Sequence, residues 1–73
     1  MYKVVVSGLK QVFEAEYYKA LGLFYEFIRT TDYNIMLYKY DGSDYVLLSI
    51  GGTDEEGNKT YKDLVRNTSN EAI

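Results

Sequence analysis

The chain has 73 residues and a formal net charge of −3, with 8 basic and 11 acidic side chains, so it forms one small domain at most. It contains no histidine, cysteine, proline or tryptophan. Disulfides, thiolate nucleophiles, ordinary zinc sites and Ser-His-Asp triads are therefore excluded. No enzymatic activity, metal or cofactor is expected.

The first predicted elements are a strand and a helix. Residues 3–7 form a β-branched run that Gly8 closes, which is typical of a strand. From about Lys10 to Arg29 the apolar residues recur at three- and four-residue spacing, which predicts a helix. Ser7 is a plausible N-cap, and the Thr-Thr-Asp triplet at 30–32 should end the helix. The helical stripe consists of Phe13, Tyr17, Ala20, Leu21, Phe24, Phe27 and Ile28.

Two further strands, 34–40 and 45–50, flank an Asp-Gly-Ser-Asp turn, the strongest hairpin signal in the chain. Gly51-Gly52 is expected to loosen the chain, and residues 53–58 form an acidic turn. Residues 59–65 fit a fourth strand slightly better than a short helix. The domain then spans 1–66, and residues 67–73 form a frayed tail.

These elements predict an α+β domain, in the order β-α-β-β plus a fourth short strand or helix. One helix packs on one face of a mainly antiparallel sheet. The strand–helix–strand crossover is expected to be right-handed. The first strand should lie beside strand 45–50, antiparallel to it. The other face of the sheet stays uncovered in this arrangement.

Alternation along the hairpin sorts its side chains onto two faces. The aliphatic face, expected to pack on the helix, carries Ile35, Leu37, Lys39, Val46, Leu48 and Ile50. The other face carries a group that we call the tyrosine plate: Met36, Tyr38, Tyr40, Tyr45 and Leu47, with Asn34, Ser43 and Ser49 beside it. The predicted core consists of Leu21, Phe24, Ile28, Leu37, Val46 and Leu48.

The tyrosine plate is the main candidate binding surface, because an uncovered sheet face normally carries polar residues. It suits a homodimer or small-oligomer interface, or a surface for a different protein. Alternatively, cross-strand tyrosine pairs stabilise the sheet, or the C-terminal element covers them. Base stacking is a further alternative, but flanking basic residues are not expected there. Tyr18, Gly22 and Tyr25 form a secondary candidate interface on the helix, where Gly22 suggests close approach of another backbone.

The acidic residues of the turns form a candidate patch. A divalent cation is one possible ligand, and imitation of a nucleic-acid backbone is another use of such charge. Solvated turn charge is the simplest interpretation, and no metal site is predicted. The patch consists of Asp41, Asp44, Asp54, Glu55 and Glu56.

These features together predict a small non-enzymatic protein-binding module that self-associates. The residue types with AT-rich codons (Phe, Tyr, Met, Ile, Asn and Lys) total 28, against 11 for those with GC-rich codons (Gly, Ala, Arg and Pro). In its small size and this bias the chain resembles accessory proteins of phages or mobile elements, which suggests an inhibitor or adaptor that acts on a host protein. The alternatives are a nucleic-acid-binding module that uses the tyrosine plate, and an acidic nucleic-acid mimic. No signal-peptide core or membrane span is present in the sequence, so a cytoplasmic location without membrane contact is expected.

Overall fold

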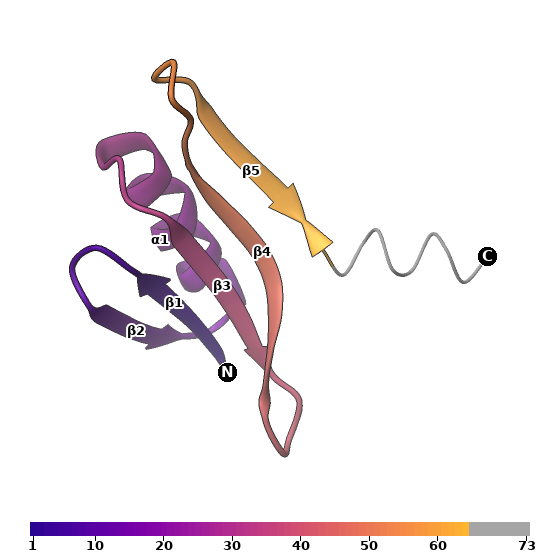
Figure 1. The fold of residues 1–73 in the computed structure, drawn as a ribbon. Coiled ribbons are helices and arrows are strands. Elements are labelled where there is room, and N and C mark those ends of the chain that lie inside the picture. The colour runs from indigo at the N-terminus through magenta and orange to yellow at the C-terminus, as the bar shows by residue number, and fades with distance from the viewer. Residues whose placement is uncertain (65–73) are drawn as a thin grey trace.

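The computed structural model describes residues 1–64 and shows an α+β domain, in which one helix packs against one face of a five-stranded antiparallel sheet (Figure 1). The sheet order is β2-β1-β3-β4-β5. The predicted fold class is therefore confirmed, whereas the predicted tail at 67–73 lies outside the described residues. In chain order the elements are β1 (Tyr2–Val6), β2 (Gln11–Ala15), α1 (Tyr17–Thr30), β3 (Ile35–Tyr40), β4 (Tyr45–Thr53) and β5 (Lys59–Asp63).

Strand β2 is the largest departure from the prediction, which placed residues 11–15 in the helix. The strand pairs with β1 in an antiparallel hairpin, with Val4 opposite Phe13. Its side chains alternate: Phe13 is half-buried and Ala15 is buried, whereas Val12 and Glu14 are exposed. The helical prediction was wrong here because the four-residue spacing of Phe13 and Tyr17 fits a single helix, but fits a strand followed by a helix equally well.

The turn between β1 and β2 explains why the helix cannot begin at Lys10. Lys10 has a positive φ of 54°, and the N–H of Leu9 donates to the carbonyl of Val6 at 3.2 Å, which reverses the chain. Ser7 is therefore not the N-cap, and its hydroxyl donates instead to the Asn34 carbonyl at 3.1 Å. Glu16 is the N-cap residue of α1.

The far end of α1 matches the prediction. The helix ends at Thr30, and the N–H of Thr31 donates to the carbonyl of Phe27. The hydroxyls of both threonines also donate to carbonyls of the last helical turn, those of Glu26 and Phe27. These local bonds compete with continuation of the helix, as expected for β-branched hydroxyl residues.

Strand order also differs from the prediction, because β2 reverses the direction of the chain before the helix. Strand β1 pairs directly with β3, antiparallel to it, with Val4 opposite Leu37. The predicted neighbour, β4, lies one strand further away. Strands β2 and β3, which the helix connects, run parallel to each other, with β1 between them. The prediction instead had the helix connect the first strand, residues 3–7, to strand 34–40.

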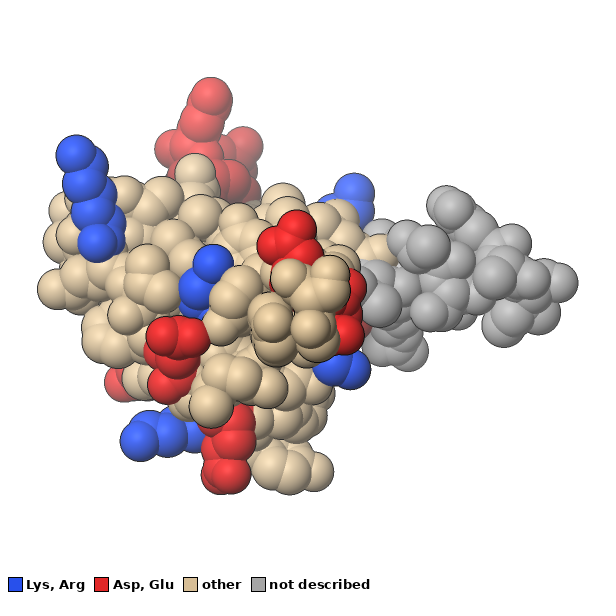
Figure 2. Space-filling model, turned by 90° about the horizontal axis from the view of Figure 1, so that it is seen from below, with Lys and Arg blue, Asp and Glu red and all other residues tan. Residues whose placement is uncertain are grey.

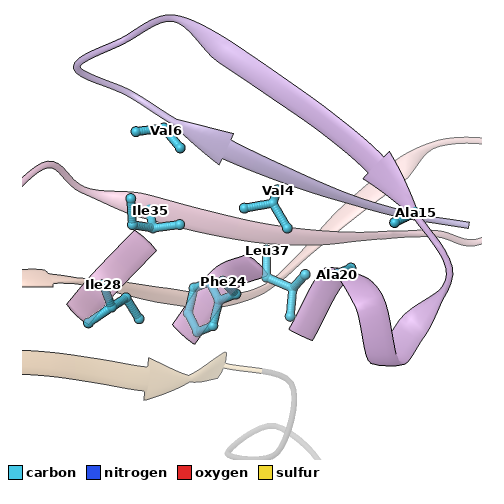
Figure 3. Close-up of a cluster of buried hydrophobic side chains, with 8 residues drawn as sticks. All are labelled: Val4, Val6, Ala15, Ala20, Phe24, Ile28, Ile35 and Leu37. Carbon is cyan, nitrogen blue, oxygen red and sulfur yellow. The ribbon is translucent and has the colours of Figure 1, made fainter. Parts of the chain in front are cut away.

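The core lies between α1 and strands β1 and β3 (Figure 3). The predicted burial of Phe24, Ile28 and Leu37 is confirmed, and Leu21 and Leu48 pack half-buried against them. Val46 was predicted wrongly, since 43% of it is exposed. It pairs with exposed Lys39 near the β3–β4 turn, where the helix does not cover the sheet. The buried hydrophobic residues are Val4, Val6, Ala15, Ala20, Phe24, Ile28, Ile35 and Leu37.

A β-bulge in β4 changes which side chains share a face. Leu37 lies opposite Ser49, but Tyr38 lies opposite Leu47, so Leu48 has no direct partner. One extra residue inverts the alternation beyond it. Ser49 therefore faces the helix side and Ile50 the opposite side, which is the reverse of the predicted assignment. Leu48 remains on the helix side, as predicted.

The two glycines of β4 continue the strand rather than loosen it. A Cβ added at Gly51 would lie 2.3 Å from Cδ1 of Ile28, and one at Gly52 would lie 2.7 Å from Oδ1 of Asn34. Both residues therefore permit close packing that a larger residue would obstruct. The strand ends at Thr53, opposite Lys59, so the slightly favoured assignment of 59–65 as a strand is confirmed for Lys59–Asp63.

The fourteen-residue helix α1 is too short to cross a lipid bilayer, and no other helix among the described residues is long and apolar enough to do so.

Candidate functional site

The tyrosine plate lies on the sheet face opposite the helix. Residues directly opposite each other on antiparallel strands share a face, and the register pairs Tyr38 with Leu47 and Tyr40 with Tyr45. The rings of Tyr40 and Tyr45 lie with their centroids 5.2 Å apart. Met36 lies on the same face, opposite Ile50. The five predicted residues are therefore brought together as the alternation indicated.

The plate continues onto three further strands that the hairpin analysis did not include. An apolar row crosses four strands through the pairs Val12–Val5, Val5–Met36 and Met36–Ile50. Lys62 of β5 lies beside Ile50 at the end of that row. We call the plate together with Lys3, Val5, Val12, Glu14, Ile50, Thr60 and Lys62 the open face.

A cation lies within the aromatic part of the open face. The Nζ of Lys3 lies 4.1 Å from the ring centroid of Tyr45 and 4.9 Å from that of Tyr38. The expectation that basic residues are missing from this face was therefore wrong. The period-two alternation of β1 already placed Lys3 and Val5 on one face, but without the sheet order it did not show which face.

A second polar contact fixes the orientation of Tyr45. Its hydroxyl donates a hydrogen bond to Oε2 of Glu14 at 2.7 Å. This bond to a carboxylate, together with partial desolvation, raises the pKa of Tyr45 above its ordinary value of 10.0. Lys3 and Glu14 thus contact the same tyrosine, one over its ring and the other at its hydroxyl. The aromatic cluster is preorganised rather than loosely arranged.

The open face carries more apolar surface than a solvated sheet face normally does. Val12 is 55% exposed and Ile50 38% exposed, and the ring of Tyr40 is also exposed. No helix or strand among residues 1–64 lies across this face (Figure 1). A contiguous exposed apolar patch of this kind is typical of an interaction surface.

The secondary candidate interface lies on the helix and therefore on the other side of the molecule. Tyr18 and Gly22 are exposed, and a Cβ at Gly22 would meet no atom within 4 Å. The close approach expected at Gly22 is therefore not made within the described residues. Tyr25 packs edge-on against Tyr61 of β5, with ring centroids 5.7 Å apart. The structure does not bring this group together with the tyrosine plate.

The acidic patch separates into two turns at opposite ends of β4 (Figure 1). In the first turn, Oδ1 of Asp41 accepts hydrogen bonds from the N–H groups of Asp44 and Ser43, which lower the pKa of Asp41. In the second, Oδ1 of Asp54 accepts from the N–H groups of Glu56 and Asn58. Both carboxylates therefore order the backbone of their own turns.

The face of the molecule around the β3–β4 turn is not uniformly acidic. Viewed from the end with the β3–β4 turn, acidic and basic side chains are interspersed among other residues (Figure 2). Among residues 1–64, no three acidic side chains gather into a group that could hold a metal ion. The five residues of the predicted acidic patch thus lie in two separate turns and not in one row.

Comparison with protein-family models, with curated proteins and with solved structures finds no match for this chain.

Proposed function

We propose that this protein is a non-enzymatic protein-binding module whose open face associates with a second copy of the same chain. The observation that carries the proposal is the position of Met36, Tyr38, Tyr40, Tyr45 and Leu47 on a sheet face that no described element covers. Tyrosine and methionine are enriched at protein interfaces, where apolar contact and a polar group are both useful.

The charges of the open face favour a second copy over an unrelated partner. Lys3 and Glu14 lie on neighbouring strands, directly opposite each other in the register. A two-fold interface places the same patch on both subunits. A face that carries charges of both signs can therefore match itself, with Lys3 of one copy near Glu14 of the other.

The size of the face sets the affinity that we expect. Five strands of five to nine residues, about 4.8 Å apart, cover a plane of about 480 Å². This is smaller than the roughly 800 Å² per partner of a standard interface. We therefore expect dissociation constants of about 1–100 µM, in the range of transient association.

Sedimentation velocity from about 1 µM to about 1 mM tests the proposal. The wild-type protein should pass from monomer to dimer, and Tyr38→Ala or Tyr45→Ala should weaken the dimer about 1,000-fold, because a two-fold dimer loses both copies of a central anchor worth about 2 kcal/mol each. Val46→Ala is the matched control, because Val46 lies next to Tyr45 on β4 but faces the helix side. A monomer at the highest concentration would refute self-association, as would equal effects of the Val46 and tyrosine variants.

The same face also supports a host protein as the partner. The AT-rich codon bias of the sequence fits an accessory protein of a phage or mobile element. In that case the wild-type chain stays monomeric, and Tyr38→Ala abolishes capture of one host protein from a lysate while Val46→Ala does not. Capture that is equal for both variants would rule out the open face as the surface for a host protein.

Nucleic-acid binding is the second candidate function, and the position of Lys3 over two tyrosine rings favours it. Lys62 adds a second cation at the other side of the same face. Glu14, however, lies at the hydroxyl of Tyr45, where a phosphate would be repelled. Titration with a single-stranded oligonucleotide at about 50 and 200 mM salt separates the two functions, because binding to phosphates weakens steeply with salt. Absence of oligonucleotide binding at both salt concentrations would exclude nucleic-acid binding as the function.

A further inference from the structure

A groove of ≈ 370 Å³ opens on the helix side of the sheet, away from the open face. It lies between α1 and strands β4 and β5. Its floor is apolar and comes from Leu21, Leu37 and Leu48, whereas Tyr17, Tyr25 and Tyr61 stand along its walls. The groove is separate from the surface proposed for self-association, because it lies on the other side of the sheet.

The aromatic walls of the groove are held by other rings. Tyr25 and Tyr61 meet edge to face, with an interplanar angle of 86°. Tyr17 lies between Tyr2 and Tyr18, with ring centroids 5.1 and 5.2 Å away. The walls are thus ordered by these contacts, yet Tyr61 remains 60% exposed. Ordered, accessible aromatic rings can bind a ligand without first being rearranged.

The electrostatic character of the groove favours a cation. Asp63 lines it, and no Lys or Arg among the described residues does so. Partial desolvation, Tyr61, Tyr17 and Asp63 together raise the pKa of Tyr25. Among these neighbours, Asp63 is the one that brings a formal negative charge to the groove, and a positive group would complement that charge. The faces of tyrosine rings also attract ammonium groups.

We propose that this groove binds the side chain of a lysine from a partner protein. The methylene groups of the lysine lie on the leucine floor, while its ammonium group contacts the tyrosine rings and Asp63. The same chain already shows the required contact on its other side, where Nζ of Lys3 lies against Tyr38 and Tyr45. A flexible apolar stem with a charged end matches a groove that is apolar at its floor and aromatic and acidic at its wall.

NMR titration of the full chain with acetyl-lysine-methylamide tests the proposal, with acetyl-norleucine-methylamide as the uncharged probe. The ring signals of Tyr17, Tyr25 and Tyr61 should shift saturably with the lysine probe, with a dissociation constant of about 1–10 mM. The norleucine probe should bind at least about fivefold more weakly, because it lacks the ammonium group. Equal binding of the two probes, or no saturable shift with either, would overturn the proposal.

Four variants examine the roles of the ring and the charge. Tyr61→Leu and Asp63→Asn should each weaken the lysine probe about two- to fivefold, whereas Tyr61→Phe, which keeps the ring, should bind as wild type. Glu26→Gln is the charge control, since it removes one acidic group from the exposed surface of α1 outside the groove. A loss with Tyr61→Phe as large as with Tyr61→Leu would contradict the cation–ring contact, as would a loss with Glu26→Gln as large as with Asp63→Asn.

The amide spectrum of each variant reports whether the fold is kept. Tyr61 and Asp63 lie on the edge strand β5, outside the buried core. The proposal is also independent of self-association. Tyr38→Ala should keep lysine binding while it weakens the dimer, and Tyr61→Leu should have the reverse effect. Loss of lysine binding in Tyr38→Ala with the fold intact would contradict the placement of the site.

Discussion

Replacement of Phe24 is the most direct test of the fold, because this ring is 1% exposed and lies at the centre of the core (Figure 3). A buried aromatic side chain removes about 150–250 Å² from water. At about 25 cal/mol per Å² this corresponds to roughly 4–6 kcal/mol. Truncation of a buried phenylalanine to alanine, which retains part of that burial but leaves a cavity, costs about 3–5 kcal/mol.

That cost is comparable to the whole stability of a domain of this size, for which a single core rarely supplies more than about 3–5 kcal/mol. Phe24→Ala should therefore be largely unfolded at 25 °C. Phe24→Leu, which keeps most of the volume, should cost about 1 kcal/mol. In a domain of 60–100 residues this lowers the melting temperature by about 4–8 °C. Thermal and urea unfolding followed by circular dichroism measure both changes.

Val46→Ala is the matched comparison for the core prediction. Alternation alone assigns Val46 to the core, whereas the structure leaves it 43% exposed beside Lys39. Its truncation should cost about 0.5 kcal/mol, as for other surface substitutions. If Val46→Ala destabilises the protein as much as Phe24→Leu, or if Phe24→Ala remains well folded, the packing of the helix on the sheet described above is wrong.

Two further predictions concern glycines and acid stability. Gly22→Ala should stabilise the protein by about 1 kcal/mol, since the added Cβ lies in mid-helix and meets nothing within 4 Å. Gly51→Ala should destabilise it by about 1–3 kcal/mol, because its Cβ would clash with Ile28. The urea midpoints should therefore shift in opposite directions from wild type, and destabilisation of both variants would contradict the position of the helix. Asp41 has a lowered pKa in the folded state. Its contribution to the free energy of unfolding is therefore fully present above the unfolded-state pKa near 4, and is lost as the pH falls through the folded-state pKa. Melting temperatures between about pH 7 and pH 2 should therefore fall less steeply below pH 4 for Asp41→Asn than for wild type, and identical slopes would show that the turn carboxylate contributes nothing.

Short-range patterns were sufficient for several features of the fold and the site. The Asp-Gly turn predicted the β3–β4 hairpin, because Asp41 bonds to backbone groups only two and three residues away. The hydroxyls of Thr30 and Thr31 likewise end the helix through bonds within its last turn. Period-two alternation placed Tyr38, Tyr40 and Tyr45 on one face, because side-chain direction along a strand is a local property.

Other features depended on partners distant in the sequence. Residues 11–15 form a strand because β1 offers them an edge to pair with, although their spacing also fits a helix. The bulge at Leu48 is set by the pairing of two strands, and it alone moved Ile50 to the open face and Ser49 to the helix side. A register shift of one residue leaves no mark on either strand by itself.

The sequence by itself therefore determined the fold class, the absence of thiol and imidazole chemistry, and the aromatic character of one hairpin face. Only the tertiary structure decided that Lys3 lies within that face, because this required the pairing of β1 with β3. The groove beside Tyr17 and Tyr61 likewise arises where a helix meets a strand 44 positions further along the chain. Local patterns fix the direction of a side chain relative to its own strand or helix, but long-range packing decides which other side chains it meets.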